Sequence, residues 1–115
     1  MTRADSSSFP TDDRFVSIKH ESHQIVVRLR GEHDISNAAA LREILAEATS
    51  RSDRNVVLDL SAVTFMGAAT LSVLIWAREL LAEQSRCWVL RSPSQCVRRL
   101  FEVCGLAEFF DHHRA

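Results

Sequence analysis

The chain has 115 residues, 46% of them hydrophobic, which predicts one domain with a single core. Its 14 basic and 15 acidic residues nearly balance and form no long blocks, which argues against a nucleic-acid partner. Three cysteines without a CxxC spacing, no signal peptide and no apolar run long enough to cross a membrane predict a reduced, cytoplasmic setting.

The first half of the chain predicts a leader, two strands and a helix. Residues 1–13 are rich in Ser, Thr and Asp, and we expect a flexible leader outside the core. β-branched residues mark 15–18 and 24–29, which predict two strands joined in a hairpin. Ser36 or Asn37 is expected to cap the following helix. The apolar stripe of that helix, spaced to face a sheet, consists of Leu41, Ile44, Leu45 and Ala48.

The second half alternates strands and helices. An apolar run at 56–60 predicts a strand buried on both faces, and a helix is expected over 69–84. A further strand at 87–90 precedes a helix over 93–103, which Gly105 ends. The order β-β-α-β-α-β-α predicts an α/β fold, with a mixed sheet of about four strands and helices mainly on one face.

The most informative segment is the turn between the apolar strand and the apolar helix, Gly67-Ala68-Ala69-Thr70. A helix start offers free N–H groups and the positive end of the helix dipole, which suit phosphate chemistry. The turn nevertheless contains no serine and no acid. Thr70 is interpreted as the N-cap of the helix, in preference to a nucleophile or a phosphoacceptor.

Three segments resemble the signature segments of one family: IVVRLRGEHD at 25–34, NVVLDLSAVTFMGAATL at 55–71 and LRSPSQCVRRLFEVCGL at 90–106. In this order and at these separations they are similar to the STAS domain in its bacterial anti-sigma-factor-antagonist form. The resemblance covers nearly all of residues 14–110. It implies the STAS fold and a single STAS domain, which we place at 14–112.

Members of this family are usually switched by phosphorylation of a serine in the turn, and this chain lacks that serine. The family turn is usually Asp-Ser-Ser-Gly or a close variant, and the anti-sigma factor, itself a kinase, phosphorylates one serine. Position by position, Gly67 stands in place of the Asp and Ala69 in place of the phosphorylated Ser. Thr70 lies one residue later, about 100° further round the helix. Because unmodified family members bind the kinase and free the sigma factor, the resemblance implies a constitutively binding-competent chain.

Other polar residues have less specific interpretations. Glu32 and Asp34 are a candidate carboxylate pair beside the turn, although a solvated strand end with Asp34 preparing the next helix is the favoured alternative. Asp59 is expected to be solvated or bound to N–H groups rather than to orient a substrate. Cys104 and the histidines at 112–113 lack a metal-ligand spacing, so we predict no metal. No motif predicts a cofactor or an enzymatic activity.

The helix over 69–84 is apolar around more of its circumference than one sheet face can bury. Val73 and Trp76 extend this surface beyond the main stripe. Trp76 is therefore a candidate anchor for a partner. A position under the neighbouring helix is an equally good interpretation.

The sequence thus predicts a non-enzymatic module that binds an anti-sigma factor of the histidine-kinase-like ATPase type and so releases a sigma factor. The alternative is a STAS accessory subunit that binds the ATPase of an ABC lipid transporter. No membrane insertion is expected, and a homodimer remains open. The expected partner-binding residues are Glu32, Asp34, Gly67, Ala68, Ala69, Thr70, Val73 and Trp76.

Overall fold

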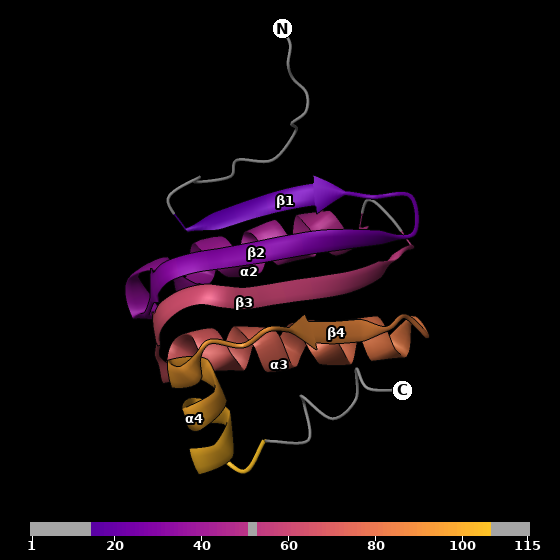
Figure 1. Ribbon diagram of the computed structural model, residues 1–115. Coiled ribbons are helices and arrows are strands. Elements are labelled where there is room, and N and C mark those ends of the chain that lie inside the picture. Colours follow the sequence, from indigo (N-terminus) through magenta and orange to yellow (C-terminus); the bar gives the residue numbers. More distant parts are fainter. Residues whose placement is uncertain (1–14, 51–52, 107–115) are drawn as a thin grey trace, which may run out of the picture.

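The computed structural model describes residues 15–50 and 53–106. In chain order its elements are β1 (Val16–His20), β2 (Gln24–His33), α2 (Ile35–Ser50), β3 (Asn55–Met66), α3 (Ala68–Glu83), β4 (Trp88–Arg91) and α4 (Gln95–Val103) (Figure 1). The predicted element order is therefore confirmed. The expected leader at 1–13 lies outside the described residues, and the domain bounds 14–112 stay a prediction.

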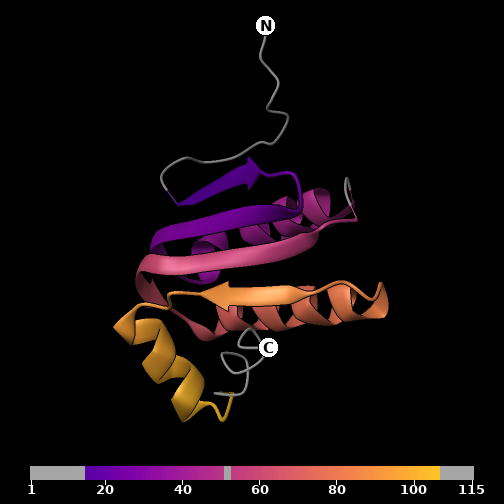
Figure 2. The same cartoon turned by 45° about the vertical axis from the view of Figure 1, so that its right-hand side comes forward.

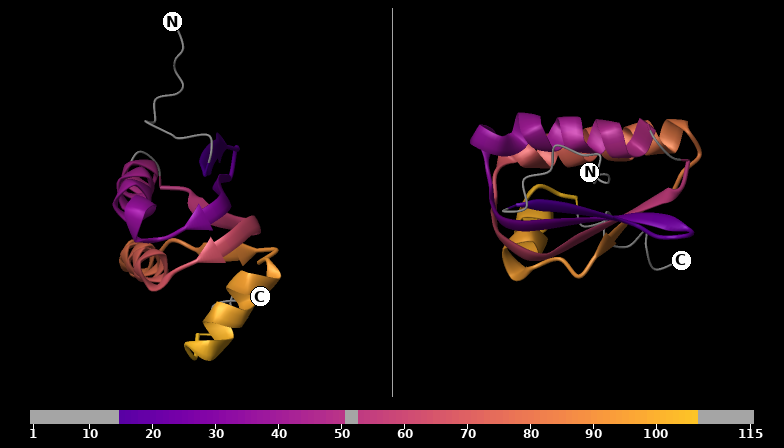
Figure 3. Two further views of the ribbon diagram at one scale, coloured as in Figure 1. Left: turned by 90° about the vertical axis from the view of Figure 1, so that its left-hand side faces the viewer. Right: turned by 90° about the horizontal axis from the view of Figure 1, so that it is seen from above.

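The four strands form one mixed sheet in the order β1-β2-β3-β4. β1 pairs antiparallel with β2, whereas β2, β3 and β4 run parallel. α2 and α3 lie side by side on one face, and α4 lies on the other, against β3 (Figures 2 and 3). The prediction of helices mainly on one face is confirmed. No helix in the described part of the chain is long and apolar enough to cross a membrane.

The main core lies between the sheet and the α2–α3 pair. Alternate residues of the strands point into it, because successive side chains of a strand face opposite sides. The fully buried residues of β2 and β3 include Ile25, Val27, Leu58 and Leu60. The predicted stripe of α2 is buried as well: Leu41, Ile44, Leu45 and Ala48. The apolar spacing of the sequence therefore located the core correctly.

β2 and β3 both extend beyond the apolar runs that predicted them. β2 ends at His33, and β3 ends at Met66 rather than near Leu60. Register shifts interrupt the pairing of these extensions, and Gly31 there takes a φ of +76°, which favours glycine. Pairing nevertheless continues to His33 opposite Met66. The carboxyl ends of the two strands therefore meet at one edge of the sheet.

α2 begins earlier than predicted, because Asp34 caps it in place of Ser36 or Asn37. The Ser36 N–H donates to Asp34 Oδ1 at 2.9 Å, and the Asp34 N–H donates to Asn37 Oδ1 at 3.0 Å. Such reciprocal bonds form a capping box. The hydrogen bonds from the Ser36 hydroxyl and N–H lower the pKa of the Asp34 carboxyl. The interpretation in which Asp34 prepares the helix is confirmed.

Candidate docking site

The turn between β3 and α3 lies at the sheet edge where β2 also ends. The Gly67 N–H donates to the His33 carbonyl at 2.9 Å, which ties the turn to the end of β2. Gly67 is the N-cap of α3 with φ −96° and ψ 175°, and it makes no side-chain cap bond. The first N–H groups of α3 therefore depend on solvent or on a partner for hydrogen bonds.

Two large apolar side chains are exposed beside this turn. Ile35, the first residue of α2, is 83% exposed, and Phe65, near the end of β3, is 51% exposed. Glu32 is exposed too and lies opposite Phe65 in the β2–β3 register. We call Glu32, Ile35, Phe65, Gly67 and Ala68 the turn surface. The two large exposed apolar side chains beside one turn make this surface a candidate for partner binding.

Neither Ile35 nor Phe65 is among the residues predicted from the sequence. The segment 34–37, interpreted as a capping box, would have placed Ile35 at the first helical position, outside the apolar stripe. Phe65 has no comparable signal, because the register shifts of β3 break the simple alternation of strand faces.

Two of the predicted partner-binding residues are buried. Thr70 has no exposed surface, and Val73 is 8% exposed and belongs to the hydrophobic core. The predicted cap at Thr70 is wrong, because α3 already begins at Ala68 and Gly67 holds the cap position. With this earlier start, Thr70 falls on the side of the first turn that faces the interior. Neither side chain is available to a docked partner.

The other predicted residues of this region reach the surface. Glu32 and Ala68 are exposed, whereas Asp34, Gly67 and Ala69 are half-buried. Ala69 also packs partly against the hydrophobic core. The role of these residues in partner binding stays a prediction.

The sequence left open whether Trp76 is an exposed anchor or lies under the neighbouring helix, and the structure shows an intermediate position. Its side chain is half-buried and packs against the hydrophobic core. The guanidinium of Arg42, from α2, lies over the indole ring with Cζ 4.3 Å from the ring centroid. Trp76 is thus neither fully enclosed nor freely exposed, since Arg42 covers one face of its ring.

His33, whose carbonyl holds the turn, is a completely buried histidine. Its Nε2 lies 3.1 Å from the Arg30 carbonyl, and Nδ1 has no hydrogen-bond partner in the described structure. The ring packs against Phe15 at a centroid distance of 5.4 Å. Burial lowers the pKa of His33 below its ordinary 6.5, although the carbonyls of Arg30 and Phe15 and the charge of Asp34 oppose this effect.

We expect the contribution of His33 to make the free energy of unfolding depend on pH. The free energy should be highest above pH 6.5 and should fall as the pH drops from 6.5 towards the lowered pKa of folded His33. In this window the unfolded chain binds a proton that the folded protein does not, so acid favours unfolding. Asp34, whose pKa is lowered from 3.8, contributes only in more acidic solution. Urea unfolding at about pH 7.5 and about pH 5.5 measures the loss.

His33→Gln should reduce this pH dependence. His23→Gln is the matched control, because His23 is an exposed histidine of the hairpin and the change is the same. An equal loss of stability in the parent chain and in His33→Gln would contradict the assignment to His33.

The remaining polar candidates do not form a reactive cluster. Asp59 Oδ1 accepts hydrogen bonds from the N–H of Ser61 at 3.0 Å and from its hydroxyl at 2.8 Å, which confirms the N–H-bound interpretation of Asp59. Among residues 15–50 and 53–106, no three metal-ligating side chains come together. Cys104 is exposed, and the histidines at 112–113 lie outside the described residues.

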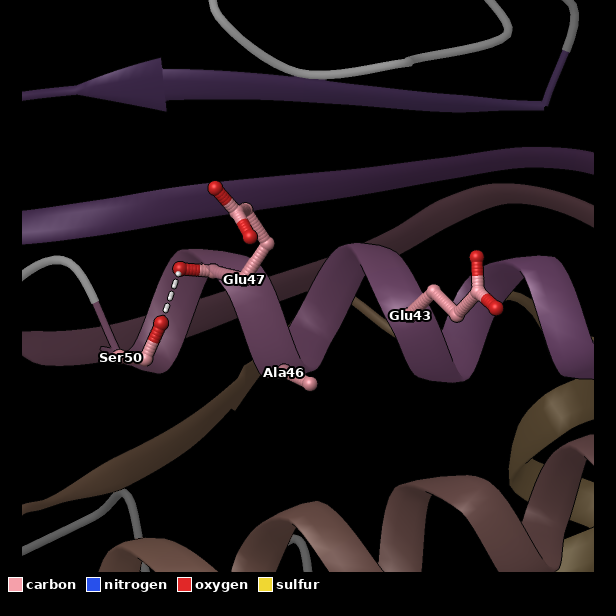
Figure 4. Close-up of a pocket in the computed structure, with 4 residues that line it drawn as sticks. All are labelled: Glu43, Ala46, Glu47 and Ser50. Atoms are coloured by element: carbon pink, nitrogen blue, oxygen red, sulfur yellow. Dashed lines mark hydrogen bonds between the residues drawn. The ribbon is translucent and has the colours of Figure 1, made fainter.

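A hollow beside α2 is lined by Glu43, Ala46, Glu47 and Ser50, all from this one helix (Figure 4). The Ser50 hydroxyl donates to the Glu47 carbonyl at 3.1 Å and is thereby engaged within the helix. The two carboxylates lie a helical turn apart and do not converge on one point (Figure 4). We therefore assign no ligand to this hollow.

Comparison with known proteins identifies the family of the chain. The STAS domain model matches residues 15–115. The anti-sigma-F factor antagonist RsfB of Mycobacterium tuberculosis is 30% identical over 99 residues, which cover 86% of this chain and 80% of RsfB. The anti-sigma-B factor antagonist of Bacillus subtilis is 27% identical over 96 residues, which cover 84% of this chain and 87% of the relative.

Solved structures show the same fold. An anti-sigma factor antagonist from Mycobacterium paratuberculosis superposes with a TM-score of 0.68 at 30% identity, over 83% of this chain and 80% of that one. Unphosphorylated SpoIIAA, an anti-sigma factor antagonist, superposes with a TM-score of 0.73 at 20% identity, over 83% and 84% of the two chains, which supports the fold. From the matching domain model, the relatives and the sheet topology, this chain belongs to the STAS domain family.

Proposed function

We propose that this chain is an anti-sigma factor antagonist that docks its turn surface on an anti-sigma factor of the histidine-kinase-like ATPase type and so frees a sigma factor. Relatives at 30% identity are named anti-sigma factor antagonists, which supports the proposal. The observation that carries the proposal is the exposed apolar pair, Ile35 and Phe65, beside the start of α3. Burial of each such side chain contributes about 1.5–3 kcal/mol before the costs of association.

The chemistry of the turn surface supports binding rather than catalysis. Glu32 is its one charged side chain, and the rest is apolar or backbone. Thr70, the one hydroxyl residue of the turn sequence 67–70, is fully buried. A catalytic site would need a nucleophile or an acid–base pair that reaches a bound substrate.

Calorimetric titration of the purified chain with each histidine-kinase-like anti-sigma factor of its own cell tests the function. We expect one of them to bind and to release its sigma factor when the chain is added. Binding of an ABC transporter ATPase in place of every anti-sigma factor would favour the accessory-subunit alternative. A chain that binds no anti-sigma factor would contradict the proposal.

We predict that the partner kinase adds no phosphate to the turn. Ala69 has no hydroxyl, and the Thr70 hydroxyl is buried beneath the surface. The chain should therefore stay binding-competent in the presence of ATP. Incubation with the kinase and ATP, followed by mass spectrometry, checks this, and stoichiometric phosphate on Thr70 would contradict it.

A paired substitution provides the positive control. A Cβ at Gly67 would meet the Phe65 ring at 3.6 Å and Asp34 Cα at 3.8 Å, which are ordinary contacts, so the turn has room for a side chain. Gly67→Asp together with Ala69→Ser should therefore fold and present the acid and hydroxyl of the family turn. We expect the double variant to be phosphorylated under conditions in which the parent chain is not.

A further inference from the structure

α2 and α3 begin at the same edge of the sheet, because β2 and β3 are parallel and each leads directly into one of these helices. α2 and α3 lie side by side, as Figure 3 shows. Both helices therefore continue away from the turn surface over the same face of the molecule. A partner seated on the turn surface would also face the exposed sides of these helices.

One stripe on each helix leads away from the turn. On α2, positions 35, 39 and 42 follow the i, i+4, i+7 spacing, and on α3, positions 68, 72 and 76 follow the i, i+4, i+8 spacing. We call these residues the helix-pair face: Ile35, Ala39 and Arg42 with Ala68, Ser72 and Trp76. All of them are exposed except Trp76, which is half-buried. The contact between Arg42 and Trp76 shows that the two stripes adjoin.

The sizes of the side chains on this face would allow a partner segment to dock. Ala39 and Ser72, in the middle of the two stripes, have short exposed side chains. Ile35 stands at the turn end, and the Arg42–Trp76 pair stands about 10 Å away, two helical turns further on. Short side chains in the middle of the face would let a partner helix or loop approach the two helices closely.

Arg42 is an exposed arginine whose guanidinium lies over an aromatic ring. Its guanidinium is stacked on Trp76 and therefore ordered, which reduces the entropy lost on forming a further contact. No ion pair joins Arg42 to a carboxylate among residues 15–50 and 53–106, although Glu43 follows it on α2 and Glu79 lies on α3, the helix that carries Trp76. A stacked guanidinium keeps its in-plane N–H groups free to hold a carboxylate in bidentate fashion.

We propose that the docking site extends from the turn surface along the helix-pair face, and that the anti-sigma factor presents an aspartate or glutamate side chain to Arg42. This inference rests on the proposed function. Trp76 acts as a positioning residue: its ring holds the guanidinium where the partner's carboxylate arrives. The Trp76 ring, which also packs against the hydrophobic core, thus supports Arg42 rather than contacting the partner directly.

Charge reversal at Arg42 tests this inference by titration with the anti-sigma factor that binds the parent chain. Arg42→Glu should weaken binding more than about tenfold, and Arg42→Lys should weaken it less, because an ammonium keeps the charge but not the bidentate geometry. Arg99→Glu is the matched control, since Arg99 is an exposed helical arginine on α4, across the sheet. We expect that control to change the dissociation constant less than about twofold.

A compensating change in the anti-sigma factor identifies the contact itself. One Asp→Arg or Glu→Arg substitution in the anti-sigma factor should restore much of its affinity for Arg42→Glu and should weaken its affinity for the parent chain. Trp76→Leu should weaken binding several-fold, because it removes the platform while keeping an apolar side chain. Melting curves of the variants confirm that each is folded.

The outcomes separate this inference from the proposed function. If Arg42→Glu binds as tightly as the parent chain while a substitution in the turn abolishes binding, the extension to Arg42 is wrong and the function stands. Loss of binding that no charge reversal in the anti-sigma factor restores also contradicts the carboxylate contact. If the parent chain binds no anti-sigma factor, the function fails and this inference fails with it.

Discussion

Ala69→Glu is expected to weaken binding of the anti-sigma factor about 100-fold, which corresponds to about 2.7 kcal/mol, while the protein stays folded. Ala69 lies in the turn beside the exposed Ala68, and its Cβ is half-buried. A carboxylate there adds bulk and an unpaired charge where the docked surfaces must pack closely. In the free chain the start of α3 favours this carboxylate by about 0.3–1 kcal/mol, which limits the cost to folding.

Two measurements separate binding from folding. Calorimetric titration gives the affinity of Ala69→Glu for the anti-sigma factor, and thermal melting gives its stability. Ala82→Glu is the matched control, because it introduces the same group at an exposed alanine near the other end of α3. A folded Ala69→Glu variant with the affinity of the parent chain would move the interface away from the turn.

The sequence predicted the core and the topology because both depend on patterns that survive small errors. The stripe Leu41, Ile44, Leu45 and Ala48 is buried whether α2 begins at Ile35 or two residues later. Element ends are less robust, since they depend on single hydrogen bonds. Asp34 caps α2 through a reciprocal pair of bonds with residues 36 and 37, and either of those two had an equally suitable side chain.

The sequence predicted the region of the candidate site, but it did not predict which residues of that region are exposed. The turn Gly67–Thr70 follows from the boundary between two apolar segments, which one sequence suffices to find. Which side of α3 faces the interior depends on where the helix starts, and a start at Ala68 buries Thr70 and Val73. The exposure of Phe65 depends on register shifts between β2 and β3, which leave no mark in the apolar pattern.

Arg86 is a charged residue whose structural role also could not be predicted from the sequence. It precedes β4 and is only 9% exposed. Its Nε and Nη2 donate to the Arg54 carbonyl at 2.9 and 2.6 Å, and Nη1 donates to the Thr49 carbonyl at 2.7 Å and to Gln84 Oε1 at 2.8 Å. One side chain thus joins the end of α2 to the residue before β3. Because the Thr49 and Arg54 carbonyls are more than thirty positions from Arg86 in sequence, no local spacing predicts these two contacts.

Arg86→Ala is accordingly expected to lower the free energy of unfolding by about 3 kcal/mol. The substitution removes a charged donor and leaves the carbonyls of Thr49 and Arg54 without it in a partly buried place, and hydrogen bonds to charged groups contribute about 1.5–3 kcal/mol each. Urea unfolding should show a lower midpoint with an unchanged slope.

Arg91→Ala, at an exposed arginine of β4, is the control and should change stability by less than about 0.5 kcal/mol. If both variants cost equally little, the bonds of Arg86 do not hold the end of α2 to β3. A large loss confined to Arg86→Ala would show that these bonds stabilise the contact between the end of α2 and the residue before β3.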